Sequence, residues 1–191
     1  MTWQGWPVKR LFDIVLALLL APIALLIVAV CAIGIRLSSP GPAILRQERI
    51  GRAEQPFICF KLRTMRIGTP HLASHLTSAS VITPLGKQLR RFKLDEVPQL
   101  WNILRGEMSF VGPRPCLPSQ HQLIEARRAL LVYNLRPGIT GVSQVAGVDM
   151  SDPVRLAVLD ATYLRNMTMK HDFKLIVATG LGAGRGDRVG A

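Results

Sequence analysis

The sequence predicts an α+β protein that is mainly helical, with a proline-interrupted N-terminal membrane segment and one small β-hairpin. Three observations support this class. Residues 14–35 carry no charged side chain, residues 43–51 and 56–65 are rich in apolar and β-branched residues, and later segments repeat apolar residues at helical spacing. At 191 residues, the chain has the length of one domain.

The N-terminal stretch is long enough to cross a membrane. As a straight helix, its 22 uncharged residues would rise roughly 33 Å. Pro22 lies near the middle, where it removes a backbone donor and favours a kink or a break. Basic residues flank both ends, although a spanning helix tends to keep them on one side. The residues alone leave two alternatives open: a hairpin that returns to the cytoplasmic face, and a kinked transmembrane anchor.

A turn at residues 37–42 leads into the two strand-like segments, which predict a β-hairpin. Residues 67–83 show no clean period and predict a loop or a short helix. Helices are expected from about residue 94, over 119–135 with Ser119 as N-cap, after the N-cap Asp152, and over 171–181. Segments around 108–118 and 136–141 are expected to be loops and turns, and the glycine-rich residues 180–191 a flexible end.

The composition is both basic and apolar. Lys and Arg number 24 against 12 Asp and Glu, which gives a formal net charge of +12, and the mean hydropathy is +0.27. Such a chain suits nucleic acid, an anionic membrane surface or a phosphorylated substrate. The three cysteines show no CxxC spacing, which indicates a reduced compartment without a disulfide framework or zinc site. His71 and His75 have i, i+4 spacing but no third ligand, so they predict no metal site.

The segment FKLDEVPQLWN, residues 92–102, places two carboxylates side by side in this basic chain. Asp95 and Glu96 are expected in the first turn of a helix, where the helix dipole favours anions. Adjacent helical residues point about 100° apart, so the two carboxylates need not share one proton. One could act as nucleophile or metal ligand while the other orients it or exchanges a proton. On helix-start composition alone, a solvated acidic turn is the simpler interpretation.

Basic residues at turns and element ends accompany the pair. They are Lys61, Arg63, Arg90, Arg91, Arg114 and Arg136. The planar fork of Arg suits phosphate oxygens, and glycine and proline fix the loops around Arg114 and Arg136. Each cation alone is most simply a solvated charge. Together with an acidic pair, they suit phosphoryl transfer, which needs cationic clamps and usually a divalent metal held by carboxylate.

Four segments in this order resemble the bacterial sugar transferase family, the monotopic phosphoglycosyl transferases. They are KRLFD before the apolar stretch, FKLRTM, LRRFKLDEVPQLWNILRGEMSFVGPRP and RPGITG. The resemblance covers nearly the whole chain, and the central motif is long and specific. It implies one sugar transferase domain over residues 1–191 in the minimal catalytic form. It also implies a re-entrant membrane helix-break-helix over residues 1–37, broken at Pro22, and amphipathic interfacial helices.

The resemblance implies a two-step chemistry. Asp95 is the nucleophile that attacks the β-phosphate of a UDP-sugar, expected to be an N-acetylated hexose derivative, and Glu96 completes the dyad. UMP leaves, and polyprenyl (undecaprenyl) phosphate then accepts the phosphosugar from the aspartyl intermediate. Mg²⁺ is the implied cofactor, with Asp95 as its ligand. The implied phosphate or substrate-binding residues are Lys61, Arg90, Arg114 and Arg136.

The implied location is the cytoplasmic face of the bacterial inner membrane, and the implied process is the first membrane step of glycoconjugate assembly. Three positions depart from the family pattern: Ala21 replaces a frequent Ser, Lys93 replaces the usual Ser or Thr, and VSQVAGVDM follows RPGITG. A membrane-tethered basic nucleic-acid-binding protein and a structural anchor are the alternatives, but neither gives a reason for the acidic pair. No nucleic acid partner is expected, and the oligomeric state, a homodimer included, is left open.

Overall fold

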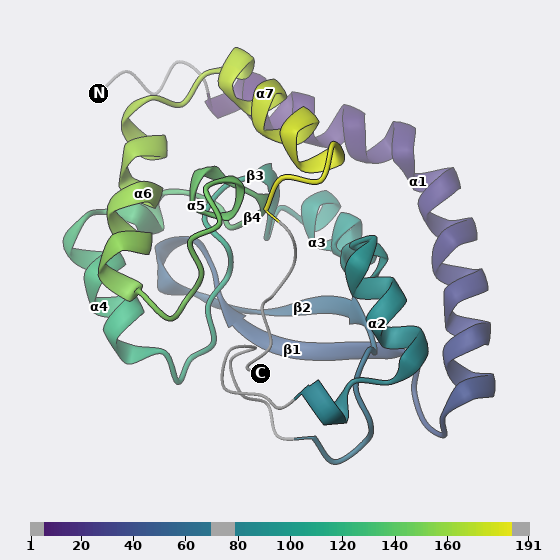
Figure 1. The fold of residues 1–191 in the computed structure, drawn as a ribbon. Helices are drawn as coiled ribbons and strands as arrows, with labels where there is room; N and C mark the ends of the chain where they lie inside the picture. Colours follow the sequence, from purple (N-terminus) through teal and green to yellow (C-terminus); the bar gives the residue numbers. More distant parts are fainter. Residues whose placement is uncertain (1–5, 70–78, 185–191) are drawn as a thin grey trace.

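The computed structural model describes residues 6–69 and 79–184, and their arrangement is shown in Figure 1. The chain is mainly helical, as predicted. The helices are α1 (Trp6–Ser38), α2 (Pro84–Arg91), α3 (Gln99–Arg105), α4 (His121–Ala129), α5 (Val142–Val145), α6 (Pro153–Arg165) and α7 (Met169–Gly180). The strands are β1 (Ile44–Ile50), β2 (Pro56–Leu62), β3 (Ser109–Val111) and β4 (Gly138–Thr140). Single 3-10 turns are η2 (Arg52–Glu54), η4 (Ala79–Val81), η5 (Leu94–Glu96) and η6 (Val132–Asn134).

The N-terminal helix α1 is continuous, with Pro22 inside it, rather than two helices separated by a break. It changes direction midway along its length (Figure 1). Proline explains a bend without a full break, because its ring clashes with one carbonyl of the preceding turn and removes one donor only. The expected kink therefore has a counterpart in the structure, whereas the re-entrant path through a membrane stays a prediction.

The apolar part of α1 has the length and composition to cross a membrane, and only 6% of its most apolar window is buried in the protein. A row of large apolar side chains is left without protein cover: Leu18, Leu19, Ile23, Leu25, Leu26, Val30 and Ile33. A continuous apolar surface of this kind marks contact with a partner or a membrane. The helix indicates that the chain associates with a membrane.

Both ends of α1 are fixed to the rest of the protein. Near the start, the buried ammonium of Lys9 lies 2.6 Å from Asp172 on α7 and 3.5 Å from Asp13. The hydroxyl of Tyr163 donates to the other oxygen of Asp172 at 2.6 Å. Near the end of α1, Ile35 is buried in a cluster with residues of β2 and α2. The exposed apolar row therefore lies between two packed ends.

The predicted β-hairpin is confirmed. Strands β1 and β2 pair antiparallel, with Ile44 opposite Leu62 and Ile50 opposite Pro56. A second sheet, in which β3 and β4 run parallel, lies where only a loop and a turn were expected. Its strands have three residues each, which is too short to show the period-two alternation that identifies a strand in a sequence.

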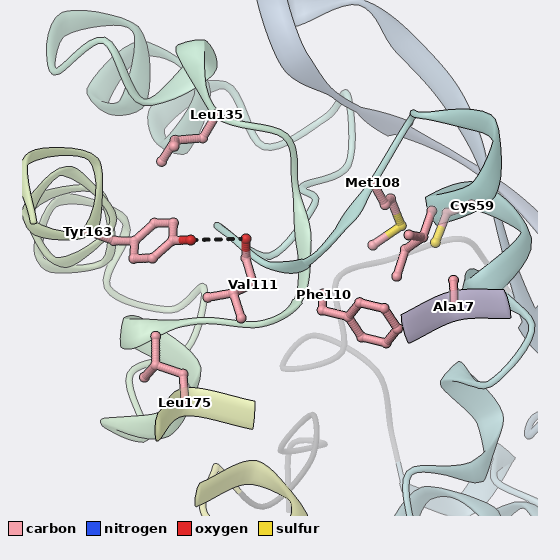
Figure 2. Close-up of a cluster of buried hydrophobic side chains, with 9 residues drawn as sticks. Ala17, Cys59, Met108, Phe110, Val111, Leu135, Tyr163 and Leu175 are labelled. Atoms are coloured by element: carbon pink, nitrogen blue, oxygen red, sulfur yellow. Dashed lines mark hydrogen bonds between the residues drawn. The ribbon is translucent and has the colours of Figure 1, made fainter. Parts of the chain in front are cut away.

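The main core lies between this small sheet and the surrounding helices. Figure 2 shows Met108, Phe110 and Val111 beside side chains from α1, β2, α6 and α7. The hydroxyl of Tyr163 reaches the carbonyl of Val111 at 3.4 Å, shown as a dashed line. Since α1 contributes the fully buried Ala17, one face of the first half of the helix packs against the main core.

The predicted helix caps have mixed outcomes. Asp152 caps α6 by accepting from the backbone of Arg155, with Pro153 as the first helical residue, as expected. Ser119 is not a cap: α4 begins at His121, and Gln120 instead folds back to accept from the backbone of Leu117.

Helix α2 was not predicted at all, although the side chain of Thr83 caps it by accepting from Gly86. On α7, Leu175 is buried while Phe173 and Val177 are exposed. An interfacial location for these helices stays a prediction. The interpretations of His71, His75 and residues 185–191 concern positions outside the described part of the chain.

Candidate active site

The acidic pair lies on η5, a single 3-10 turn between α2 and α3. This corrects the expectation of a first α-helical turn, because α3 starts only at Gln99, with Pro98 as its N-cap. Lys93 begins the turn in the left-handed region, at φ 56°. A non-glycine residue there costs about 1 kcal/mol or more, and such strain concentrates at functional sites. The turn places both carboxylates in the connection between α2 and α3.

Glu96 is buried and holds two cations. Its Oε1 atom accepts from Lys61 Nζ at 3.2 Å and from Arg114 Nη2 at 2.7 Å. Lys61 comes from strand β2, and Arg114 from the loop after β3. Three of the predicted site residues, far apart in sequence, therefore meet at one carboxylate.

Asp95 is partly exposed, whereas its neighbour Glu96 is buried. The two carboxylates thus have different environments despite their adjacency. Glu96 is buried between two cations. Asp95 is the more exposed member of the pair, and exposure is what a nucleophile or a metal ligand requires.

Arg90 lies at the end of α2, where basic side chains face the negative end of the helix dipole. Its Nε donates to Thr64 Oγ1 at 2.9 Å, which fixes the guanidinium plane. Its Nη1 atom is buried and has no hydrogen-bond partner among the residues that the structure describes. A buried guanidinium nitrogen without a partner is costly unless an anion completes it. Arg90 therefore fits the predicted phosphate contact.

The loop that carries Arg114 is rigid. Pro113 and Pro115 flank the arginine, and Gly112 lies directly against β4. A Cβ atom on Gly112 would lie 2.2 Å from the carbonyl oxygen of Arg136, so a side chain there would push the loop away from β4. The glycine and the two prolines hold Arg114 in its position toward Glu96.

Among the residues that the structure describes, Arg136 makes no hydrogen bond or ion pair with this cluster. Its Nε donates to the carbonyl of Gly106 at 2.9 Å, and it borders a small cavity together with Lys9 and Asp13 on α1. Burial lowers the pKa of its guanidinium, and the nearby Arg52 lowers it further. A substrate-binding role for Arg136 stays a prediction.

Two more titratable groups lie beside the dyad. Burial lowers the pKa of Lys93, partly offset by the charge of Glu96, and its ammonium donates to the carbonyl of Ala183 at 3.0 Å. Burial also raises the pKa of the Cys59 thiol, while Lys61 acts in the opposite direction. Cys59 is fully buried, so it is a packing residue beneath the site.

The implied Mg²⁺ can be tested against the donors that are present. The described residues include no group of three or more His, Cys, Asp or Glu side chains that could hold a metal ion. Mg²⁺ does not need one, since it is usually held by one or two carboxylates together with substrate phosphates and water. The partly exposed Asp95 fits such a ligand. A metal here would be shared with the substrate.

An acidic pair beside clustered cations, next to a membrane-length helix, defines a membrane-associated protein whose site suits a phosphorylated substrate. Comparison with known proteins supplies the family. Residues 4–183 match the bacterial sugar transferase family, and the chain belongs to this family of transferases.

Three relatives illustrate the similarity. The UDP-glucose:undecaprenyl-phosphate glucose-1-phosphate transferase of Caulobacter vibrioides is 37% identical over 180 residues, 90% of this chain and 67% of that protein. The Escherichia coli K12 protein of the same name is 36% identical over 182 residues, 90% of this chain and 39% of that protein. The putative undecaprenyl-phosphate N-acetylgalactosaminyl 1-phosphate transferase of Bacillus subtilis is 43% identical over 113 residues, 58% of this chain and 63% of that protein. The chain thus spans less than two thirds of the length of the last two.

Sequence reasoning missed several residues that shape the site. Thr64, which fixes Arg90, lies within the FKLRTM segment, but the sequence analysis gave it no role. Arg127 on α4 was treated as one more position in a helical pattern, yet it is almost fully buried and donates to the Arg114 carbonyl at 2.9 Å. Thr64 and Arg127 hold other residues in place, and a single sequence gives little sign of such a role.

Proposed function

We propose that this chain transfers a phosphosugar from a UDP-sugar to polyprenyl phosphate, with undecaprenyl phosphate as the expected acceptor, and releases UMP. The reaction would take place at the cytoplasmic face of the bacterial inner membrane, as an early step of glycoconjugate assembly. The single observation that carries the proposal is the reachable Asp95 beside Glu96, which is fixed by Lys61 and Arg114. The names of the relatives support the substrate classes.

In the first proposed step, a carboxylate oxygen of Asp95 attacks the β-phosphorus of the UDP-sugar. A new oxygen–phosphorus bond forms, the bond from this phosphorus to the bridging oxygen breaks, and UMP leaves with that oxygen. In the second step, a phosphate oxygen of the lipid attacks the same phosphorus and the Asp95 bond breaks. The product is polyprenyl-diphospho-sugar, and the carboxylate is regenerated. Each step is an ordinary displacement, which is the benefit of a covalent route.

The fixed cations would bind and orient the phosphates. Arg90 would offer its guanidinium to an anionic oxygen, and its bond to Thr64 would hold the fork in place. Glu96 would keep Lys61 and Arg114 close together. A bound Mg²⁺, held by Asp95 and phosphate oxygens, would supply further neutralisation of the diphosphate charge.

The sugar is the least constrained part of the proposal. An N-acetylated hexose derivative stays a prediction, since the named relatives include both glucose and N-acetylgalactosaminyl transferases. A panel of UDP-sugars with undecaprenyl phosphate in detergent, scored for UMP, would identify it. Stoichiometric UDP in place of UMP would refute the phosphosugar transfer itself.

The nucleophile can be tested by Asp95→Asn. Asparagine has nearly the same shape, but its amide is a poor nucleophile, so turnover should fall by several orders of magnitude. Wild-type protein given UDP-sugar with a labelled β-phosphate and no lipid should acquire label, and Asp95→Asn protein should not. Glu107→Gln, an acid-to-amide change on the loop after α3, serves as the control and should acquire label. Turnover of Asp95→Asn within about tenfold of wild type would reduce Asp95 to a metal ligand.

A further inference from the structure

The loop that carries Arg114 is held at three consecutive carbonyl groups. The carbonyl of Pro113 accepts from the backbone N–H of Gly138 at 2.9 Å. The carbonyl of Arg114 accepts from Arg127 Nη1 at 2.9 Å, and that of Pro115 accepts from Arg49 Nη1 at 2.9 Å. The three donors come from β4, α4 and β1. Because each of these three carbonyl groups is bonded to a different secondary-structure element, the loop has little freedom to move.

Arg127 is an unusual donor because it is 1% exposed. Its Nε and Nη2 atoms both donate to Asp160 Oδ2 on α6, at 3.0 and 2.7 Å. The hydroxyl of Ser143 donates to the other oxygen of Asp160 at 2.8 Å. Asp160 and Ser143 are also buried. Each strong donor of Arg127 thus has a partner, and its third nitrogen is directed at the loop.

Stability alone does not account for this arrangement. Transfer of two charges from water into a protein interior is expensive, and apolar residues of similar volume are often at least as stabilising as a buried ion pair. Asp160 holds the guanidinium in one plane, and this orientation points Nη1 at the Arg114 carbonyl. An apolar replacement could fill the volume but could not fix the loop.

We infer that Arg127, oriented by Asp160 and Ser143, is a positioning residue that sets the distance between Arg114 and Glu96, with Arg49 as a second, weaker support on the other side of the loop. This inference rests on the proposed function, since its purpose would be to hold the cation cluster in place for the diphosphate. It connects the α4–α6 pair, which contributes no predicted substrate contact, to the catalytic turn.

The test is a double-mutant cycle on turnover. Arg127→Lys keeps the charge but loses the fork, so it cannot reach both Asp160 and the loop carbonyl. UMP release per folded enzyme should fall about 10- to 100-fold, because a shift near 1 Å in a catalytic group costs up to about 100-fold. In an Arg114→Gln background, the same change should cost less than about threefold, since the side chain that it positions has gone.

The neighbouring Arg128→Lys is the matched control, because Arg128 is exposed and pairs with Glu54; it should leave turnover unchanged. Arg49→Gln gives the same test if Arg127→Lys does not fold, with an expected loss of about 3- to 10-fold only when Arg114 is present. An equal loss in both backgrounds, or no loss at all, would overturn the inference.

Failure of the proposed function would look different. Wild-type protein would then release no UMP from any UDP-sugar, and the inference would be tested on stability alone. The unfolding free energies of Arg127→Lys and Glu96→Gln should then be non-additive, because both residues bond to Arg114, one at its carbonyl and the other at its guanidinium. Additive values would refute the positioning role without reference to any reaction.

Discussion

The ion cluster at Glu96 makes a quantitative prediction for stability. Glu96→Gln removes one negative charge while it keeps the shape of the side chain and one acceptor oxygen. Lys61 and Arg114 then remain beside a neutral group, with side chains only 11% and 19% exposed. They cannot regain full hydration without movement of β2 or of the loop after β3.

The size of the effect follows from the loss of one charge from a buried cluster. Removal of one partner from a buried ion pair costs about 3–5 kcal/mol. The amide introduced by Glu96→Gln keeps an acceptor oxygen for the two cations, so we expect a smaller loss of about 2–3 kcal/mol. For a chain of this size, the melting temperature should fall by roughly 4–12 °C.

Thermal unfolding in detergent, followed by intrinsic fluorescence, measures this change. Glu54→Gln is the control, since Glu54 accepts three hydrogen bonds from Arg128 at the surface, where solvent screens the pair and little change is expected. Equal melting temperatures for Glu96→Gln and wild type, or equal losses in the two variants, would refute the view that Glu96 is a buried counterion.

Arg90, the metal and the path of α1 can each be tested in the same way. Arg90→Lys keeps a charge but loses the guanidinium fork. KM for the UDP-sugar should therefore rise about 10-fold or more, as expected for loss of a charge-assisted hydrogen bond. An unchanged KM would show that Arg90 does not contact the substrate. Chelation of Mg²⁺ should stop UMP release while the melting temperature stays within error, and undiminished turnover would exclude the metal. Single cysteines at positions 5 and 48 should both react with a membrane-impermeant maleimide from the cytoplasmic side. Pro22→Ala should lower labelling at one of the two positions. Labelling of only one position in the protein with Pro22 would favour a transmembrane helix.

The acidic pair and the β-hairpin could be predicted because their signals are local. Two adjacent carboxylates in a basic chain are visible by inspection, and a long motif gives them a family context. The hairpin consists of two segments with β-branched residues and a short turn between them. The composition of the strands and the position of the turn therefore predict the same structure. The cap of α6 belongs to the same group, since Asp152 and Pro153 occupy adjacent positions with fixed roles.

The features that could not be predicted depend on contacts between distant segments. Nothing near Arg114 shows that it meets a carboxylate 18 positions earlier. Strands β3 and β4 form by pairing with each other, and the composition of neither segment predicts a strand. For Pro22, the local rule allows both a kink and a break, and the choice depends on how the two ends of the helix pack.

The packing of α1 at both ends has a consequence for how the protein would meet a bilayer. A protein on a flexible linker samples many orientations, and its active site spends only a fraction of the time near the surface. Here Lys9, Asp13 and Ala17 fix one end of the helix, and Ile35 fixes the other. The exposed apolar row is therefore packed into the same fold as η5, and the depth to which it inserts would also set the height of Asp95 above the lipid. The protein and a lipid substrate would then meet by lateral diffusion in the plane of the membrane, with Asp95 held at one height.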